Sequence, residues 1–379
     1  IQIQRGVGTS TNGAAAFGAS INLKTDEIRK DAHLLTNNTL GSFATLKNNI
    51  EFGTGLINNK FSFEGCLSKI LSDGYIDRAT SNLKSLYLQG AYFGKSSIIK
   101  ALMFAGHERT YQAWYGVPLN YLETNRTYNP YTYDNEVDNY RQIHYQLHYS
   151  KQMSKIINYN ISAHYTHGEG YYEQEKLGED LTDYNLENII LNNDTISSSD
   201  LIRRKWLNND FGGLTLSLTH KIGSLDLILG GATNRYCGQH YGNIIWAQYA
   251  SNADFNHQYY WDKAEKWDHN LYAKANYKYN DATNLYADLQ IRRIDYTFVG
   301  YNEDGGSAKQ KISLASFNPK FGVYHDLNQN QFMYVSFAVA NKEPNRNDYV
   351  ESTPNSRPEH ETLYDTEVGY KQNWNKLSL

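Results

Sequence analysis

The sequence predicts an all-β protein whose strands form a transmembrane, antiparallel, up-and-down β-barrel. Three observations lead to this prediction: many segments alternate apolar and polar side chains, the connections between them alternate between short and long, and aromatic residues make up 14% of the chain. No run of 18 apolar residues occurs. A spanning helix is therefore not expected, and a closed barrel is the membrane-spanning structure that remains.

The alternation is clearest between residues 285 and 292. One face of this segment is apolar, with Leu285, Ala287, Leu289 and Ile291. The other is polar, with Tyr286, Asp288, Gln290 and Arg292. Segments 143–150, 214–219 and 271–278 repeat the pattern. Such strands face an apolar and an aqueous medium at once, but a soluble β-sandwich alternates too, so the pattern alone does not decide between the two.

The order of the connections favours the barrel. Fourteen complete strands are predicted, at 34–41, 45–56, 60–71, 83–94, 97–108, 139–150, 156–168, 210–222, 225–237, 267–279, 284–298, 312–326, 331–341 and 362–373, with a further one starting near Lys376. Tight turns such as Gly223-Ser224 alternate with long connections, including 108–138, 168–209 and 238–266. All tight turns then lie at one end of the strands, as in bacterial outer-membrane barrels.

Composition excludes some partners and leaves others open. The chain has 379 residues, a formal net charge of −4 and no long basic stripe, which argues against a nucleic-acid partner. Its two cysteines, Cys66 and Cys237, are too few for a disulfide framework. The 33 tyrosines suit a membrane interface, because the ring is apolar and the hydroxyl polar, but they also suit a soluble binding surface.

The first 25 residues differ from the rest of the chain. Gly6, Gly8, Gly13 and Gly18 separate small residues, and the segment closes on the alternating stretch 19–23. Closely spaced glycines allow backbone to pass near backbone, so a compact, glycine-hinged unit is expected before the large β structure. The predicted domains are therefore 1–25 and 26–379.

This opening resembles the closing motif of the plug domain of TonB-dependent outer-membrane receptors. The similar segments are Arg5-Gly6, Asn12-Gly13-Ala14-Ala15 and Gly18-Ala19-Ser20-Ile21-Asn22-Leu23-Lys24-Thr25, and the plug-motif residues are Arg5, Gly6, Gly13, Gly18 and Asn22. Asn12 and Ala19 depart from the family pattern, which often has Tyr and Gly there. A second patch, 317–324 with 332–345 and 367–371, is similar to later barrel strands of the family.

The resemblance implies a partial receptor of Bacteroidetes type. Residues 1–25 would be the end of the plug, and 26–379 about 14 of the family's 22 barrel strands, with truncation at both ends. The implied function is active import of a bulky small-molecule chelate, of iron-siderophore, haem or cobalamin type, across the bacterial outer membrane. The TonB–ExbB–ExbD complex would act through the missing plug region, and outer-membrane lipid and lipopolysaccharide would surround the barrel.

Other functions remain open at this stage. A glycan-importing receptor of the same family, a passive porin-like barrel and a soluble carbohydrate-binding β protein are the alternatives. No enzyme activity and no cofactor are expected, because the glycines fit no nucleotide-binding motif and no nucleophile, base and orienting group stand at a recognisable spacing. A metal site is not expected either, because His144 and His148 would lie about 13 Å apart on one strand.

The long connections contain the predicted ligand-binding residues. Aromatic side chains with polar tips give large contact areas at low entropic cost, which suits capture of a bulky, partly polar ligand. The alternative is that these side chains pack the loops together or form the aromatic girdle of a barrel. The candidates are Tyr111, Trp114, Tyr115, His240, Tyr241, Trp246, Tyr259, Tyr260 and Trp261.

Overall fold

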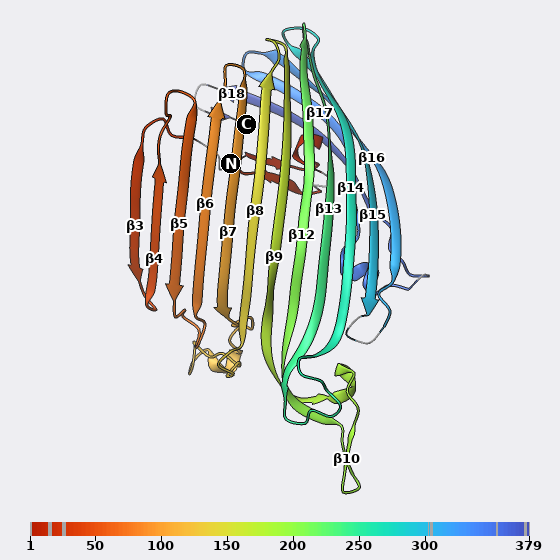
Figure 1. Ribbon diagram of the computed structural model, residues 1–379. Coiled ribbons are helices and arrows are strands. Elements are labelled where there is room, and N and C mark those ends of the chain that lie inside the picture. The colour runs from red at the N-terminus through yellow and green to blue at the C-terminus, as the bar shows by residue number, and fades with distance from the viewer. Residues whose placement is uncertain are drawn as a thin grey trace.

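The computed structural model describes residues 2–13, 17–24, 28–301, 303, 306–353, 355–374 and 377–378. One large antiparallel sheet of fifteen strands contains most of them, and each strand pairs with its neighbours in chain order. Figure 1 shows these strands side by side along the chain. Among the described residues, no helix has the length and apolar character needed to cross a membrane.

The strands of this sheet are long in its middle and shorter towards its edges. They are β3 (His33–Gly41), β4 (Thr45–Gly53), β5 (Phe61–Ser72), β6 (Ser81–Phe93), β7 (Ser97–Tyr111), β8 (Val137–Gln152), β9 (Ile157–Asp180), β12 (Ser198–Ile222), β13 (Leu225–Ala247), β14 (His257–Lys278), β15 (Thr283–Tyr301), β16 (Gln310–Asn328), β17 (Gln331–Lys342), β18 (Glu361–Trp374) and β19 (Leu377–Ser378). The fourteen predicted strands and the alternation of their connections are confirmed. The sheet has β3 and β19 at its two edges.

The prediction of long loops at 168–209 and 238–266 was wrong. Most of 168–209 and of 238–266 is strand, because β9, β12, β13 and β14 continue well past the predicted ends. In these extensions both faces carry aromatic and charged side chains, so the contrast in polarity from which a strand is read disappears. Backbone pairing nevertheless continues, for example between Trp206 and Tyr241, with register shifts only near the far ends, such as the one between Ile202 and Arg203.

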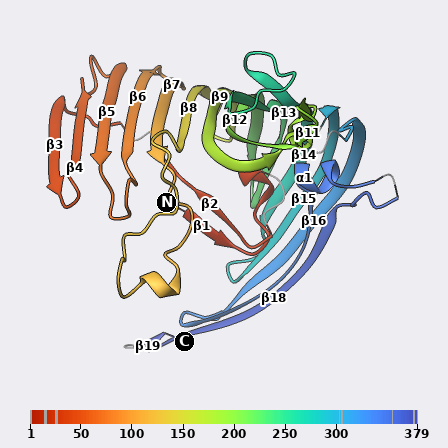
Figure 2. The same ribbon diagram turned by 90° about the horizontal axis from the view of Figure 1, so that it is seen from below.

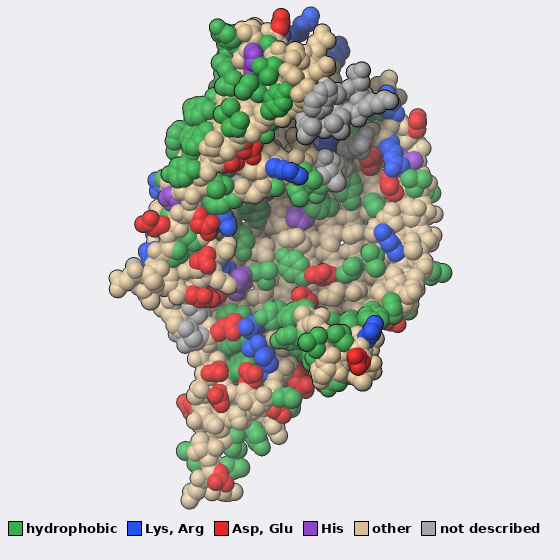
Figure 3. Space-filling model, turned by 180° about the vertical axis from the view of Figure 1, so that it is seen from behind, with side chains coloured by type: hydrophobic (Ala, Val, Ile, Leu, Met, Phe, Trp, Pro, Cys, Tyr) green, Lys and Arg blue, Asp and Glu red, His purple; other side chains and the backbone are tan. Residues whose placement is uncertain are grey.

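The sheet curves around a hollow. Seen from below in Figure 2, the later strands bend round one side, and β1 (Gln2–Arg5) and β2 (Ala19–Asn22) lie within the concave side. Figure 3 looks from behind into the hollowed face, where acidic and basic side chains are scattered among the polar ones. The concave side is the inner face of the sheet, and the convex side is its outer face.

The two faces can be assigned from exposure along β15. Leu285, Leu289 and Ile291 point outward and are exposed, whereas Asp288 is 0% and Gln290 2% exposed on the inner face. Leu147 on β8 and Leu216 on β12 are also outward, at 50% and 56% exposure. An apolar belt on the outside of a polar lumen is the arrangement expected of a membrane barrel.

The N-terminal segment forms a small hairpin. β1 pairs antiparallel with β2, with Arg5 opposite Ala19, and the amide of Gly6 donates to the carbonyl of Gly18 at 2.9 Å. Gly6 has φ of +66°, a backbone conformation that favours glycine, and a Cβ there would lie 2.9 Å from the Asp365 carboxylate on β18, which would have to move. Ala14, Ala15 and Thr25, which belong to the predicted motif, lie outside the described residues, as does the predicted boundary at residues 25 and 26.

Short elements fill the long connections. They are η1 (Ser10–Asn12), η2 (Leu119–Tyr121), η3 (Leu181–Tyr184), the hairpin β10 (Ile189–Leu191) with β11 (Asp194–Ile196), and α1 (Arg346–Val350). Two apolar clusters hold η3 and α1 to the sheet. One joins η3 to β12–β14, and the other joins Tyr349 of α1 to Ile294 and Phe298 of β15.

Candidate ligand-binding site

The inner face of β14–β17 carries a stack of polar layers that leads from the N-terminal segment to a cavity. Successive inward residues of β15 define the layers: Asp288, Gln290, Arg292 and then the apolar Ile294. The layers are counted towards the end of the strands that carries the long connections, which is the bottom of Figure 1, and "above" and "upper" mean closer to that end. Inward positions on a strand are two residues apart, which is about 7 Å. The stack therefore spans about 20 Å, roughly a third of the length of β15.

The lowest layer holds the N-terminal segment against the sheet. The carboxylate of Asp288 accepts hydrogen bonds from the Ser10 amide at 2.9 Å and the Thr9 hydroxyl at 3.1 Å. The ammonium of Lys320 donates to the Ser10 hydroxyl at 2.9 Å and lies 3.7 Å from Asp288. Because Asp288 and Lys320 are both buried, this contact ties two parts of the chain together with charge-assisted hydrogen bonds.

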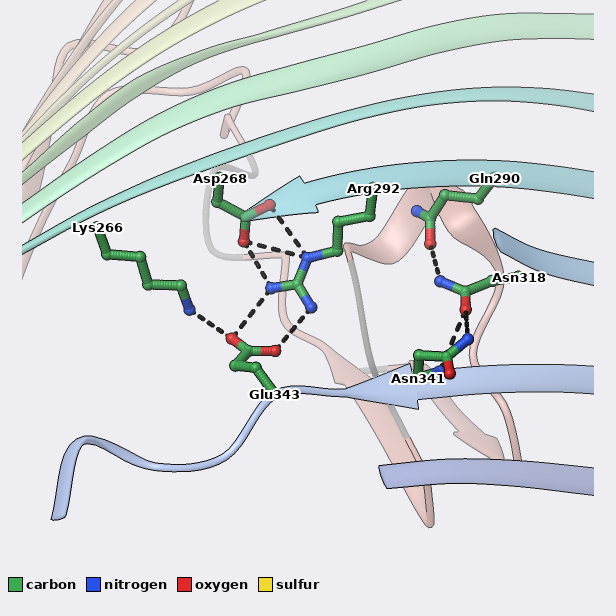
Figure 4. Close-up of polar contacts among 7 residues, drawn as sticks. All are labelled: Lys266, Asp268, Gln290, Arg292, Asn318, Asn341 and Glu343. Carbon is green, nitrogen blue, oxygen red and sulfur yellow. Dashed lines mark hydrogen bonds and ion pairs between the residues drawn. The ribbon is translucent and has the colours of Figure 1, made fainter. Parts of the chain in front are cut away.

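Above it, amide side chains connect three strands (Figure 4). The Asn318 amide donates to Gln290 at 3.0 Å, and the Asn341 amide donates to the Asn318 oxygen at 2.8 Å. These bonds run from β15 through β16 to β17. They satisfy buried polar groups and fix the inner wall at this level.

The third layer is an ion network centred on Arg292, also drawn in Figure 4. Its guanidinium donates to Asp268 at 2.6 Å and to Glu343 at 2.7 Å. Lys266 donates to the same Glu343 carboxylate. Two carboxylates and two cations are thus balanced on the wall of the hollow, with Glu343 drawn in from the connection that follows β17.

Above the network lies a cavity of about 820 Å³ between the upper parts of β8, β9 and β12–β14 and two connections. The following residues line it: Glu108, Asp138, Tyr140, Gly170, Tyr171, Tyr172, Lys205, Trp206, Leu207, His240, Tyr260, Asp262, Glu303, Asn347, Val350 and Glu351. We name this cavity the vestibule. Its volume and its mixture of aromatic and polar groups are those of a small-molecule site.

The electrostatics of the vestibule follow from burial. The pKa of His240 falls to about 4, because burial disfavours the imidazolium and the Arg346 guanidinium adds to the effect, so this ring is neutral at physiological pH. Burial also lowers the pKa of Lys205, although its hydrogen bond to Glu303 opposes the shift. Both residues lie on strand extensions above the outer apolar belt.

Helix α1 is fixed beside the vestibule from two sides. The Arg346 guanidinium forms an ion pair with Asp262 of β14, and both side chains are almost buried. Tyr349, fully buried, packs against Tyr296 and Phe298 of β15. The connection after β17 is thereby folded onto the inner wall, where Asn347 and Val350 contribute to the lining.

The nine predicted ligand-binding residues lie in different environments. His240 and Tyr260 line the vestibule. Tyr259 is 1% exposed in the apolar cluster around η3, and Trp246 is exposed near the end of β13. All four, together with Tyr241 and Trp261, belong to strands β13 or β14, so their placement in a loop was wrong.

Two of these aromatic residues, Tyr241 and Trp261, lie on the outer face. Tyr241 stacks on Trp206 with ring centroids 5.8 Å apart, and Trp261, paired with Tyr241 in register, donates to Gln239 at 3.3 Å. They form part of an outward aromatic row above the apolar belt. This matches the girdle alternative that the sequence left open.

The three remaining candidates surround the connection after β7. Tyr111 ends β7, is buried, and donates its hydroxyl to the Tyr133 carbonyl at 2.8 Å. Trp114 and Tyr115 are exposed within the connection, and Trp114 meets Tyr172 edge to face at 5.5 Å. Trp114 therefore contacts a vestibule residue, whereas Tyr111 supports the loop.

Sequence reasoning missed most of the lining. Tyr140, Tyr172, Lys205, Asp262 and Glu303 come from five different segments. A signal that could have found some of them is parity: Tyr140 and Tyr172 lie inward when the alternation of β8 and β9 is continued past the belt. Cross-strand register, which brings Lys205 opposite Tyr172, could not be read from one chain.

The histidines on the inner wall make ordinary hydrogen bonds. His144 contacts Thr166 at 2.8 Å, His148 contacts Ser162 at 2.8 Å and His164 contacts Asn234 at 2.9 Å. Among the described residues, no group of three or more His, Cys, Asp or Glu side chains is placed to hold a metal ion.

Comparison with solved structures identifies the architecture. The ferric-catecholate import receptor Fiu from E. coli K12, in its closed form, superposes with a TM-score of 0.73 at 13% identity, covering 98% of this chain and 60% of that one. The copper transporter OprC gives a TM-score of 0.74 at 12% identity, covering 99% and 56%. The chain has the fold of a TonB-dependent receptor.

A third structure agrees on this receptor fold. The ferric yersiniabactin uptake receptor FyuA from Yersinia pestis gives a TM-score of 0.69 at 10% identity, covering 99% of this chain and 57% of that one. The chain thus spans about 60% or less of the length of these three structures. No protein-family model and no curated protein matches the sequence.

Proposed function

We propose that the chain is part of a TonB-dependent receptor that imports a bulky small molecule across the bacterial outer membrane. The observation that carries the proposal is the common inner wall of β14 and β15. It binds the N-terminal segment at Asp288, and Asp262 of β14 lines the vestibule about six inward positions higher, roughly 40 Å away. A ligand held in the vestibule would then lie above a plug whose movement opens a path.

The outer face supports a membrane location over a soluble one. Leu147, Leu216, Leu271, Ile291 and Phe317 would be exposed to water in a soluble carbohydrate-binding protein. Contiguous apolar surface of this kind is costly in water and is stable against lipid. A passive porin-like barrel is less well supported, because the N-terminal segment is tied to the wall by buried, charge-assisted hydrogen bonds.

The proposed mechanism requires no bond to be made or broken in the ligand. Residues 1–25 would be the end of the plug, and 26–379 part of the barrel. The TonB–ExbB–ExbD complex would pull on the preceding part of the plug. The hydrogen bonds from Thr9 and Ser10 to Asp288 would join the end of the plug to the barrel. We therefore place the protein among transporters and not among enzymes.

The charge of the vestibule narrows the ligand class. Of the lining side chains, five are carboxylates, at Glu108, Asp138, Asp262, Glu303 and Glu351, and one is an amine, at Lys205. Asp262 is paired with Arg346 and Glu303 with Lys205, so the negative charge that remains comes from Glu108, Asp138 and Glu351. Like charge is repelled and opposite charge attracted in a cleft with low-dielectric walls. Within the iron-siderophore, haem or cobalamin range, a neutral or cationic chelate therefore fits better than a multiply anionic one.

A glycan is the second candidate ligand. Tyr140, Tyr172 and Tyr260 line the vestibule beside hydrogen-bonding groups. Aromatic faces with adjacent polar groups also suit sugar rings. A receptor of Bacteroidetes type remains a prediction from the sequence, and it would favour this second ligand.

Growth and uptake test the proposal. A deletion strain, grown in turn on neutral or cationic ferric chelates, anionic ferric chelates, haem, cobalamin and oligosaccharides as limiting nutrients, should fail on one class only. Uptake of that radiolabelled compound should stop when the proton-motive force is dissipated. Normal growth on every source, or uptake that continues without the proton-motive force, would overturn active import.

Matched variants locate the ligand. Tyr172→Ala removes an inward vestibule side chain, and Tyr241→Ala removes an outward aromatic residue from a neighbouring part of the sheet. We expect Tyr172→Ala to weaken binding by about tenfold or more, which is the effect of losing one well-packed aromatic contact. Equal losses in the two variants would place the ligand elsewhere.

A further inference from the structure

Helix α1 lies against the vestibule wall through contacts that leave three buried polar atoms without partners. They are the Nη1 nitrogen of Arg346, the hydroxyl of Tyr349 and the side-chain oxygen of Gln310, and none forms a hydrogen bond with the described residues. Gln310 belongs to β16, and its amide donates to the Tyr349 carbonyl. A buried polar group without a partner costs free energy. The docked position of α1 is therefore less favourable than its burial suggests.

The ion pair between Arg346 and Asp262 is the charged contact between α1 and the sheet. Asp262 lines the vestibule from β14, opposite His240 in register. Burial lowers the pKa of the Arg346 guanidinium, and Tyr236 and Tyr260 only partly oppose the shift. In a buried pair, the loss of hydration offsets much of the mutual attraction. The pair therefore fixes the position of Arg346 but does not prevent its exchange for another cation.

The connection that contains α1 is anchored before the helix and exposed after it. Glu343 is held by Arg292 and Lys266, whereas residues 355–357, 359 and 360 are exposed. A helix of five residues is not stable by itself, so α1 keeps its place only through Arg346 and Tyr349. Loss of the Arg346 contact would let α1 move relative to Glu343.

The position of Arg346 indicates which chemical group suits this part of the vestibule. Its guanidinium faces the Asp262 carboxylate, with the ring of Tyr260 nearby in the same wall. A carboxylate and an aromatic face both attract a cation with hydrogen-bond donors. A ligand group of the same chemistry would find both partners there once Arg346 had left.

We propose that Arg346 occupies the place of a cationic group of the ligand, and that a guanidinium or ammonium group of the ligand displaces it from Asp262. Helix α1 is then an autoinhibitory element. It closes part of the vestibule in the free receptor, and Asn347, Val350 and Glu351 leave the lining when ligand binds. This assignment rests on the proposed function, and it adds that the ligand carries a guanidinium or ammonium group.

A matched pair of probes tests the exchange in the full-length protein in nanodiscs, with binding measured by calorimetric titration. Benzamidine carries an amidinium group, and benzamide has nearly the same shape without the charge. Arg346→Gln removes the internal competitor and should bind benzamidine about tenfold more tightly than the wild type does, because the site is no longer occupied. Its binding of benzamide should change less than twofold. Asp262→Asn should bind the two probes equally.

The direction of the change distinguishes autoinhibition from a structural role. If Arg346 only supported the wall, its replacement would weaken the binding of both probes. Arg293→Gln is the control, because it removes an arginine that is paired with Asp295 on the outer face, and it should leave both affinities unchanged.

Release of α1 is measured separately, by the rate at which a maleimide labels Val350→Cys in a protein that also carries Cys66→Ser and Cys237→Ser. Val350 is half-buried and packs against the apolar cluster around Tyr349. Benzamidine should raise the labelling rate about fivefold, because it shifts α1 towards the released state. Benzamide should leave the rate unchanged.

The outcomes separate this inference from the proposed function. Weaker benzamidine binding by Arg346→Gln, or labelling of Val350→Cys that benzamidine does not change, would overturn the exchange. If the wild type imports its nutrient with the proton-motive force but fails these tests, only the autoinhibition is wrong. If import does not depend on the proton-motive force, the proposed function fails whatever the probes do.

Discussion

Side chains alternate between the two faces in both the lower and the upper half of β15, but the apolar ones lie on opposite faces in the two halves. In the lower half, Leu289 and Ile291 point outward and Asp288 and Gln290 inward. In the upper half the polarity is reversed: Arg293 and Asp295 point outward, whereas Ile294 and Phe298 are buried inward. The geometry of the strand does not change between the halves, so the change lies in what surrounds each face.

The reversal marks the point at which the proposed lipid environment ends. Below it, the outer face would meet lipid under this proposal, and the inner face lies on the side of the N-terminal segment. Above it, the outer face would meet water, and the inner face packs against Tyr349 of α1. The change takes place within two residues, and the ladders that β15 forms with β14 and β16 show no register shift across it.

Replacing the adjacent arginines at the point of reversal, Arg292 and Arg293, should give the largest difference in the free energy of unfolding. Arg292→Met leaves Asp268 and Glu343 without their shared partner on the inner wall, and should lower the free energy of unfolding by about 3–5 kcal/mol. Arg293→Met removes an exposed ion pair and should cost less than about 1 kcal/mol. Urea unfolding in lipid vesicles measures both. Equal costs would show that the two faces are not distinct at this level.

A charge placed on the outer face gives the next effect. Leu289→Arg lies within the proposed lipid belt and should cost about 2–4 kcal/mol, because the guanidinium would face hydrocarbon. Thr297→Arg lies on the same face of the same strand but above the reversal, and should cost about 0–1 kcal/mol. The comparison uses the same vesicles and denaturant. Similar values at both positions would contradict the position of the belt.

The smallest effect concerns the connection after β7 and depends on pH. Burial raises the pKa of Glu136 from its ordinary 4.5 to about 7, against the hydrogen bond from the Glu175 amide. The folded loop therefore binds the proton more tightly than the unfolded loop. Its stability is highest below about pH 4.5, falls as the pH rises to about 7, and is constant above that value.

Protease cleavage within residues 112–136, normalised at each pH to cleavage of an unfolded peptide, measures this stability. Glu136→Gln keeps the shape of the side chain and should remove the dependence on pH. A wild-type loop whose cleavage is independent of pH between 4.5 and 7 would show that the carboxyl is not buried as described.

The sequence was most informative where the outer face of a strand is apolar and its inner face is polar. The segment around Leu214, Leu216 and Leu218 was recognised because alternate residues differ sharply in polarity. The extension from Trp206 upward was missed, because its neighbours on both faces are polar or aromatic. The same lack of contrast in polarity limits prediction of the candidate site. It places His240 and Tyr260 in a loop and does not select Tyr172 and Lys205.

By itself the sequence determined the all-β class, the number of long strands and the side on which the long connections lie. These depend on local alternation and on turn lengths, which are properties of neighbouring residues. Only the tertiary structure decided that Arg292 bridges Asp268 and Glu343, that Asp288 holds Ser10, and which side chains share the vestibule. Those contacts join residues up to 278 positions apart, and they form only when register and curvature bring the strands together.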